Sequence, residues 1–600
     1  MVSLSLALAG YVWFHPATRE LAFGNAATMV GDASDSITNV WQYQLVLDTW
    51  RRSPHELLYG AIYSDQLTYP DGYGIFIPYS ERLIVLCLAP FLRVELMPTA
   101  VVWTYVVMSG LAMYSCARLF GWSRAVGLAL AIAWSISPHT RARSECHIAL
   151  VGVYFAPLAV AALHILARGL PGFGWSRLRE TLLAAVLLLA AASAAHYYLM
   201  LLVGLSPLFA LLYALLLPPA DRARGARLRA ALRLALAAAP ALVLVITTGL
   251  APLPSKEAAL AARSAAPAEA VRTANANSLH IYGAYAEDFV AGDVRFGDRD
   301  VLGARAEVTR GIRAVVLGNF HERTNGIRWT VLGGLAVLAL VLSSRRLRER
   351  VLDADERRLG AFVLLFAVGT FLLSLGPSGV RHHERDLGPV LLLARVLPAF
   401  RVANRVGVLV HFAALLASGI VATAALRRLE SVTRLPRLLR KELPGLALLV
   451  LVIVEYLPLH PVVLAPVARR RVELDPAPLS CGAGITVPYV TYGFQADHYY
   501  WTMAEIRGTS CKILHAIYLT PEDEALRAKL STRTFSPDDL ERTLAFARCT
   551  RASWAVFRLD APESYKADFC RAMGWSFVAP DACRGPANEG EPRPVRECVP

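Results

Sequence analysis

Long apolar runs alternate with short arginine-rich segments along most of the chain. The runs are roughly 16 to 22 residues long, which is the length that a helix needs to cross about 30 Å of hydrocarbon. Lipid offers no partners for backbone polar groups, so these runs are expected to be helices. The candidate spans are residues 100–119, 123–138, 150–167, 181–195, 198–217, 231–250, 328–343, 359–376, 405–426 and 443–460.

The chain begins with a shorter apolar stretch, residues 1–14. A cleaved signal peptide is one interpretation, although no charge precedes the stretch and no small-residue cleavage site follows it. We prefer a first helix, and the pattern then predicts an all-α polytopic membrane protein with about eleven transmembrane helices. Residues 79–97 are also apolar, but they contain Arg82, Arg93 and Glu95 and a proline near the middle, which favour a helix in the membrane interface.

Composition and charge agree with a membrane location. Hydrophobic residues make up 55% of the chain and charged residues 18%, below the quarter that is usual in soluble domains. The net charge of +14 could suggest nucleic acid as a partner, but the arginines concentrate in short segments between apolar runs, which is a sign of topology. The positive-inside rule places residues 168–179, 221–233, 345–358 and 427–441 in the cytoplasm.

Each transmembrane helix takes the chain to the other side of the membrane, so these assignments also determine the side on which every remaining segment lies. We expect a multi-pass protein of the cytoplasmic (inner) membrane with its N-terminus inside the cell. Residues 15–99, which include the interfacial helix, and residues 251–327 are then outer loops, and the chain after about residue 460 also lies outside.

From residue 461 onward short alternating stretches mix with helical ones, which predicts a small α/β domain over 461–600, separate from a transmembrane domain over 1–460. Six of the nine cysteines fall in this domain: Cys481, Cys511, Cys549, Cys570, Cys583 and Cys598. An even number outside the cell favours at least two disulfide bonds over unpaired core thiols, and the spacing leaves the pairing open.

Two acidic residues, Asp32 and Asp35, follow Gly31 in the first outer loop, directly before the helix-forming residues 37–50. If a helix begins there, the two carboxylates share a face, which suits a catalytic pair. Alternatively, at least one of them is simply the N-cap of that helix, a role that Asp commonly takes.

Three further outer segments carry polar residues. The short loop over residues 137–147 contains arginines, which the charge rule disfavours outside. The long segment 251–327 contains Asp288, and the residues leading into the late span at 405–426 carry two arginines four apart. The candidates are Arg141, Arg143, Glu145, His147, Asp288, Arg401 and Arg405. Arginines can clamp a phosphate, but they can equally snorkel to the interface or anchor a helix end, and a lone histidine is commonly structural.

Together these groups suit a transfer reaction at the membrane surface. An aspartate would take a proton from an attacking hydroxyl while cations stabilise a departing phosphate. No glycine-rich phosphate loop, G-x-S-x-G elbow or H-E-x-x-H motif is present in the sequence, so a nucleotide-fed or serine-hydrolase mechanism has no support.

The order of these features resembles the GT-C superfamily of polytopic glycosyltransferases, which use polyprenyl-phosphate-linked sugars, and in particular its uncharacterised bacterial members. The matching pieces are the acidic segment 31–36 with Trp41, the Tyr-Pro-Asp-Gly turn at 69–72, the interfacial helix, the turn at 118–121, the 137–147 loop and the segment 400–405. The resemblance covers residues 1 to about 460 as architecture.

The resemblance implies an inverting transfer of a sugar to an acceptor hydroxyl on a glycan, lipid or protein at the outer face of the membrane. It implies that Asp32 is the general base, with Asp35 as its partner or as a ligand of a divalent metal such as Mg or Mn, and it leaves open which aspartate leads. Glu145 and Asp288 are further metal candidates. The donor phosphate would meet Arg141, Arg143, His147, Arg401 and Arg405.

Two other functions compete with transfer. A transporter or flippase of lipid-linked saccharides would usually carry ionisable groups in mid-span, yet the candidate spans are almost free of charge, with Glu455 the main exception. A protein that only anchors the cysteine-bearing tail would not need about eleven spans. Glycosyl transfer is therefore the preferred function.

Overall fold

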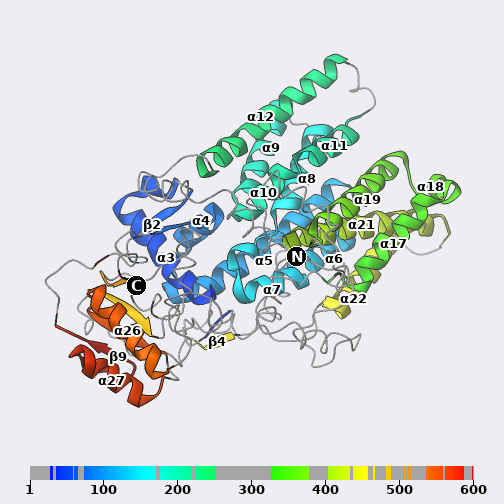
Figure 1. The fold of residues 1–600 in the computed structure, drawn as a ribbon. Helices are drawn as coiled ribbons and strands as arrows, with labels where there is room; N and C mark the ends of the chain where they lie inside the picture. The colour runs from blue at the N-terminus through cyan, green and yellow to red at the C-terminus, as the bar shows by residue number, and fades with distance from the viewer. Residues whose placement is uncertain are drawn as a thin grey trace.

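The computed structural model describes residues 28–30, 35–58, 60–64, 66, 73–170, 176–218, 224–249, 289, 326–376, 403–432, 437–456, 464–466, 482–487, 502, 506, 510–514, 535–558, 561–586, 593 and 598. Most of these residues form a bundle of helices, and a small sheet with two helices lies at one end (Figure 1).

The helices of the bundle coincide with the apolar runs of the sequence, except for the short helix over residues 345–351, which lies in a basic segment. They are α5 (Met97–Leu119), α6 (Arg124–Ser135), α8 (Phe155–Arg168), α9 (Arg177–Ala192), α10 (His196–Gly204), α11 (Ser206–Leu216), α12 (Arg224–Gly249), α17 (Trp329–Ser343), α18 (Arg345–Val351), α19 (Ala354–Ser374), α21 (Gly407–Val432) and α22 (Arg437–Tyr456). Within the described residues, a helix therefore lies at each predicted span, while the first stretch, residues 1–14, falls outside them.

Fewer helices than predicted are long and apolar enough to cross a membrane unaided. Among the described residues five qualify, namely Val94–Leu119, Ile148–Arg168, Gly225–Ile246, Ala354–Ser374 and Ala403–Arg428. A sixth span results if Trp329–Ser343 and Arg345–Val351, which meet at 112°, count as one. The structure thus has the predicted membrane-type helices without establishing eleven spans.

Proline explains two departures from the predicted elements. The run at 198–217 is split into α10 and α11 at Leu205, because Pro207 occupies the first turn of α11 and cannot continue a preceding helix. Residues 79–97 do not form one helix: α4 (Tyr79–Leu88) ends just before Pro90, and the 3-10 turn η2 (Val94–Leu96) leads into α5.

The segment expected to be a loop at 137–147 is also helical. Helix α7 (Pro138–Cys146) begins after Ser137, whose hydroxyl accepts a hydrogen bond from the backbone N–H of Thr140 at 3.2 Å. A serine N-cap followed by proline at the first helical position is a strong start signal, and it accounts for the helix.

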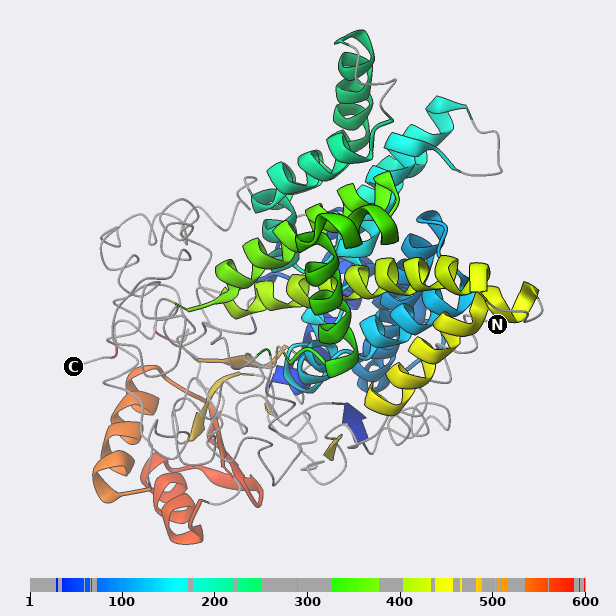
Figure 2. The same cartoon turned by 90° about the vertical axis from the view of Figure 1, so that its right-hand side faces the viewer.

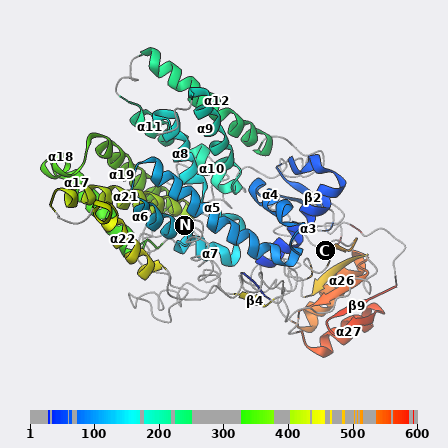
Figure 3. The same ribbon diagram turned by 180° about the vertical axis from the view of Figure 1, so that it is seen from behind.

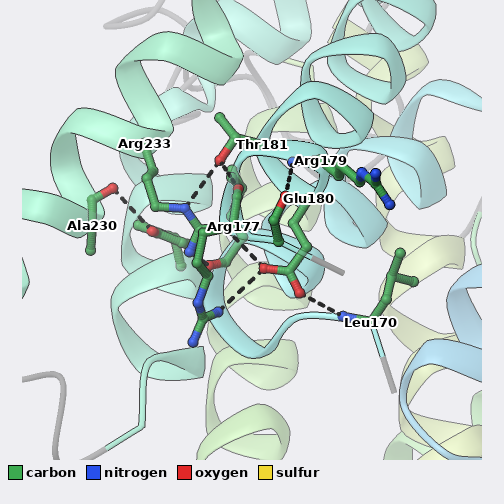
Figure 4. Close-up of polar contacts among 10 residues, drawn as sticks. Leu170, Arg177, Arg179, Glu180, Thr181, Ala230 and Arg233 are labelled. Atoms are coloured by element: carbon green, nitrogen blue, oxygen red, sulfur yellow. Dashed lines mark hydrogen bonds and ion pairs between the residues drawn. The ribbon is translucent and has the colours of Figure 1, made fainter. Parts of the chain in front are cut away.

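Ion pairs join the four basic segments. Arg168 contacts Asp355 at 2.9 Å, and Arg427 pairs with both Asp353, at 2.6 Å, and Glu356. Glu180 accepts from Arg177 and Arg233 and also from the backbone N–H of Leu170 (Figure 4). The structure therefore gathers the segments that the charge rule assigns to one side of the membrane.

A second group of elements lies away from these basic segments. Helices α3 (Asp35–Arg52) and α4 and the small strands beside them are at the opposite end of the molecule from α18, in the front view and from behind (Figure 3). Strand β1 (Thr28–Val30) pairs antiparallel with β4 (Leu464–Pro466), and β2 (Ile62–Ser64) pairs antiparallel with β3 (Tyr73–Ile75). The 3-10 helix η1 (Pro54–Leu58) follows α3.

The C-terminal part contains a mixed five-stranded sheet in the order β6-β5-β7-β9-β8. Its elements are β5 (Ala483–Val487), β6 (Lys512–Ile513), α26 (Pro537–Cys549), β7 (Trp554–Phe557), α27 (Glu563–Met573), β8 (Ser576–Ala579) and β9 (Ala582–Arg584). Helices α26 and α27 lie at the edge of the molecule, clear of the bundle (Figure 2). Two disulfide bonds, Cys549–Cys598 and Cys570–Cys583, confirm the prediction of at least two bridges.

One hydrophobic core joins the two parts. Buried residues of the sheet, among them Ile513, Trp554 and Val556, belong to the same cluster as the core of the helical bundle. The sheet therefore shares apolar packing with the bundle, and only its outer face has a separate small core.

Candidate functional site

The predicted catalytic loop lies between β1 and α3. Strand β1 ends at Val30 and α3 begins at Asp35, so residues 31–34 connect two ordered elements. Asp32 lies outside the described residues, and only the backbone of Asp35 is described. As the first helical residue, Asp35 is at the end of α3 where the helix dipole stabilises a carboxylate. The expected helix over residues 37–50 is confirmed.

Helix α7 packs against α3 and carries two of the predicted cations, Arg141 and Arg143, and a third, His147, directly follows its last residue. Arg143 is fully buried, and His147 is half-buried at the end of the helix, where its backbone N–H donates to the Arg143 carbonyl at 2.8 Å. A buried guanidinium needs acceptors or negative charge around it, so Arg143 is not an arginine that snorkels to the interface. Of Arg141 and Glu145 only the backbone is described.

A histidine on α7 also has a defined partner. His139 is buried, and its Nε2 lies 2.9 Å from the hydroxyl of Tyr198, which donates to the Leu150 carbonyl at 2.6 Å. These contacts connect α7 to α10 and to the residues before α8. They fix the position of α7 in the bundle.

A buried carboxyl lies between α3 and α4. The hydroxyl of Tyr43 on α3 donates to Glu81 on α4, and both side chains are buried. Burial raises the pKa of Glu81 to about 7, and it also raises the pKa of Tyr43 well above its ordinary value. Tyr43 therefore stays protonated at neutral pH and acts as the donor, while Glu81 is poised between its two forms.

Arg82, next to Glu81, holds the chain after α3. Its guanidinium donates to the carbonyls of Ile77, Leu57 and Gly60 at 2.8, 2.6 and 2.9 Å. Burial lowers the pKa of Arg82 to about 10, which still leaves it charged at neutral pH. Its bonds fix η1 and the chain leading to β2 against α4.

Arg405 lies in the 3-10 helix η8 (Ala403–Val406), directly before α21, as its predicted position at the entry to a late span requires. It is half-buried, and η8 packs against α19. Arg401 and Asp288 lie outside the described residues. The structure therefore brings α3 and α7 together, while the association of Arg405 with them stays a prediction.

The metal prediction also stays untested. Among the side chains that the structure describes, no group of three or more His, Cys, Asp or Glu could hold a metal ion. The acidic candidates Asp35, Glu145 and Asp288 are not among those side chains. The carboxylate oxygens of these three candidates are of the ligand type that Mg²⁺ and Mn²⁺ prefer.

Sequence reasoning missed two features of this region. Glu81 and Arg82 stand inside an apolar stretch, which was a usable signal, since ionisable groups there are expensive and seldom without a role. Gln66 lies in a polar loop and gave no such signal, yet it accepts a hydrogen bond from the indole of Trp41 on α3 at 2.8 Å.

Comparison with known proteins gives matches only at the level of structure. No family of proteins matches the sequence, and no curated protein matches it. The chain is similar to the arabinofuranosyltransferase AftD from mycobacteria, with a TM-score of 0.48 and 14% identity over 94% of this chain and 36% of that chain. It therefore spans about a third of the length of that enzyme.

The chain is also similar to the oligosaccharyltransferase of Archaeoglobus fulgidus in its apo form, with a TM-score of 0.43 and 11% identity over 92% of this chain and 69% of that one. The same archaeal enzyme in complex with an inhibitory peptide and a dolichol-phosphate gives a TM-score of 0.42 and 12% identity, over 95% and 70%. The structural neighbours are glycosyltransferases.

Proposed function

We propose that the protein is a membrane glycosyltransferase that moves a sugar from a polyprenyl-phosphate donor to an acceptor hydroxyl, with inversion, on the outer face of the cytoplasmic membrane. The glycan, lipid or protein acceptor approaches from outside, and the lipid donor enters from the bilayer beside α4. Residues 1–460 form the transmembrane domain and residues 461–600 an extracytoplasmic domain.

One observation carries this proposal: α7, with the buried Arg143, packs against α3, which begins at Asp35. A carboxylate and a cation thus come from adjacent elements, at a distance from the basic segments that gather at the other end of the molecule. This is the pairing that displacement of a phosphate by a hydroxyl requires.

The reaction follows from these groups. The acceptor oxygen attacks the anomeric carbon from the face opposite the phosphate, a new C–O bond forms, and the bond from carbon to the phosphate oxygen breaks. Asp32 or Asp35 takes the hydroxyl proton, and polyprenyl phosphate leaves with the bonding electron pair. Arg143 and the other proposed cations, Arg141, His147, Arg401 and Arg405, stabilise the charge that develops on the phosphate.

The test is transfer by the purified protein from a panel of radiolabelled polyprenyl-phosphate-linked hexoses and pentoses. Asp32→Asn and Asp35→Asn each remove a base without changing side-chain size. The variant that lacks the base should lose transfer by about 100-fold or more, because a positioned general base contributes about 100- to 10,000-fold. Insertion into the membrane should be unchanged, and Asp48→Asn, further along α3, is the matched control.

Full activity of the double variant Asp32→Asn/Asp35→Asn would rule out an aspartate base in this loop. Movement of the labelled lipid across vesicles without formation of a new glycosidic bond would instead favour the competing function, a transporter or flippase of lipid-linked saccharides.

A further inference from the structure

Gln66, the residue that the structure describes in the loop between β2 and β3, contacts the C-terminal part of the chain. The Nε1 of Trp41 on α3 donates to its Oε1 at 2.8 Å, and its Nε2 donates to the carbonyl of Ile506 at 3.3 Å. Its backbone carbonyl accepts from the N–H of Ile513 in β6 at 2.8 Å. Gln66 thus bridges α3 and the C-terminal part of the chain.

The chemistry of this bridge is specific to an amide. Trp41 supplies only a donor and the Ile506 carbonyl only an acceptor, so the residue between them must accept on one atom and donate on the other. Trp41, Ile506 and Ile513 are all buried, and a buried polar group that loses its partner is costly. Glutamate would keep the acceptor for Trp41 but lose the donor toward Ile506.

A second contact with the same part of the chain lies on the other side of the catalytic loop. Met29 in β1 is paired with Ala465 in β4, which follows the last bundle helix, α22. The described elements on both sides of the loop are therefore anchored: β1, which ends at Val30, pairs with β4, and α3, which begins at Asp35, carries Trp41 bound to Gln66. Both anchors depend on residues beyond position 460.

We infer that Gln66 is a positioning residue, which sets the catalytic loop through α3 and makes transfer depend on a docked C-terminal sheet. The inference rests on the proposed function for its effect on rate. It differs from the expectation that residues 461–600 form a domain separate from the transmembrane domain, because transfer would then require the C-terminal sheet. Gln66 itself touches neither donor nor acceptor.

The test uses the full-length protein in lipid nanodiscs and the donor that the wild-type protein accepts from the panel above. Gln66→Leu removes the side-chain bonds to Trp41 and to Ile506. Gln66→Glu removes the donor to Ile506 and keeps the acceptor for Trp41, and Trp41→Phe removes the indole donor. Gln44→Ala is the matched control, because Gln44 is a glutamine of α3 that bonds Asp48 in its own helix at 2.8 Å.

We expect Gln66→Leu and Gln66→Glu to lower kcat by about 10- to 100-fold with the donor KM changed by less than about twofold, since a displacement of about 1 Å can cost about 100-fold in rate. The double variant Trp41→Phe/Gln66→Leu should have the same kcat as Gln66→Leu alone, because both substitutions remove the same hydrogen bond between Trp41 and Gln66. Amide exchange should rise in peptides covering 28–40 and 506–514, and Gln44→Ala should match the wild type.

A kcat of Gln66→Leu within about twofold of the wild type would overturn the inference, and so would exchange that rises throughout the chain, which would mark a general loss of stability. The exchange measurement needs no substrate. If the wild-type protein transfers no sugar, the proposed function fails, while unchanged exchange in the two peptides still refutes the bridge and a rise confined to them still supports it.

Discussion

Glu81 is a buried carboxyl with a tyrosine as its hydrogen-bond donor and an arginine, Arg82, next in the chain. The hydroxyl of Tyr43 and the charge of Arg82 favour the ionised form, but desolvation outweighs both and raises the pKa to about 7. The protonated form is therefore the one that the fold favours below neutral pH. The bond to Tyr43 links α4 to the helix that begins at Asp35.

Replacing Glu81 should change how stability depends on pH. The pKa of Glu81 in the folded protein, about 7, lies above its ordinary value of 4.5. The contribution of Glu81 to the free energy of unfolding is therefore fully present below pH 4.5 and is lost as pH rises through 7. Thermal unfolding in detergent should show the wild-type Tm falling over this window relative to that of Glu81→Gln. Glu56→Gln, in the adjacent η1, is the control and should follow the wild type.

Parallel pH profiles for Glu81→Gln and the wild type would show that Glu81 titrates at its ordinary value. Its burial against Tyr43 would then not govern its protonation.

At the scale of elements, the apolar runs predicted where helices lie, because helix formation in lipid is imposed by the solvent. Breaks inside the runs were harder to foresee. Pro207 and Pro90 were visible as helix breakers, and Ser137-Pro138 was visible as a helix start, but these short signals compete with the longer hydrophobic pattern. The contact of α7 with α3 depends on tertiary packing and left no trace in local sequence.

The sides of the membrane on which these elements lie can be tested by cysteine labelling in intact cells. Cys87 on α4 is exposed, and we expect an impermeant maleimide to label it from outside, so that Cys87→Ser lowers labelling. In the Cys87→Ser background, Arg350→Cys on α18 should be labelled only after permeabilisation, because its basic segment is proposed to be cytoplasmic.

If Arg350→Cys is labelled in intact cells and Cys87→Ser does not lower labelling, the topology is the inverse of the one proposed. The aspartate loop would then face the cytoplasm, and an extracytoplasmic transfer would be excluded.

At the scale of the molecule, the charge pattern of the sequence predicted which basic segments lie together. The arginine segments that the positive-inside rule grouped are joined by Arg168–Asp355, Arg427–Asp353 and Arg233–Glu180. The C-terminal part of the molecule was predicted only in part. The C-terminal sheet and its disulfides followed from alternation and cysteine count. Its shared core with the bundle and the bond between Gln66 and Ile506, which are 440 residues apart, join distant segments, and no local pattern encodes such contacts.

The central claim is that a lipid-linked phosphate binds beside the aspartate loop, and a cryo-EM structure of the protein in nanodiscs with a polyprenyl monophosphate tests it most directly. We predict phosphate density within about 4 Å of one or more of Arg141, Arg143, His147, Arg401 and Arg405, next to the start of α3. A phosphate bound far from all five residues and from Asp32 and Asp35 would contradict the account.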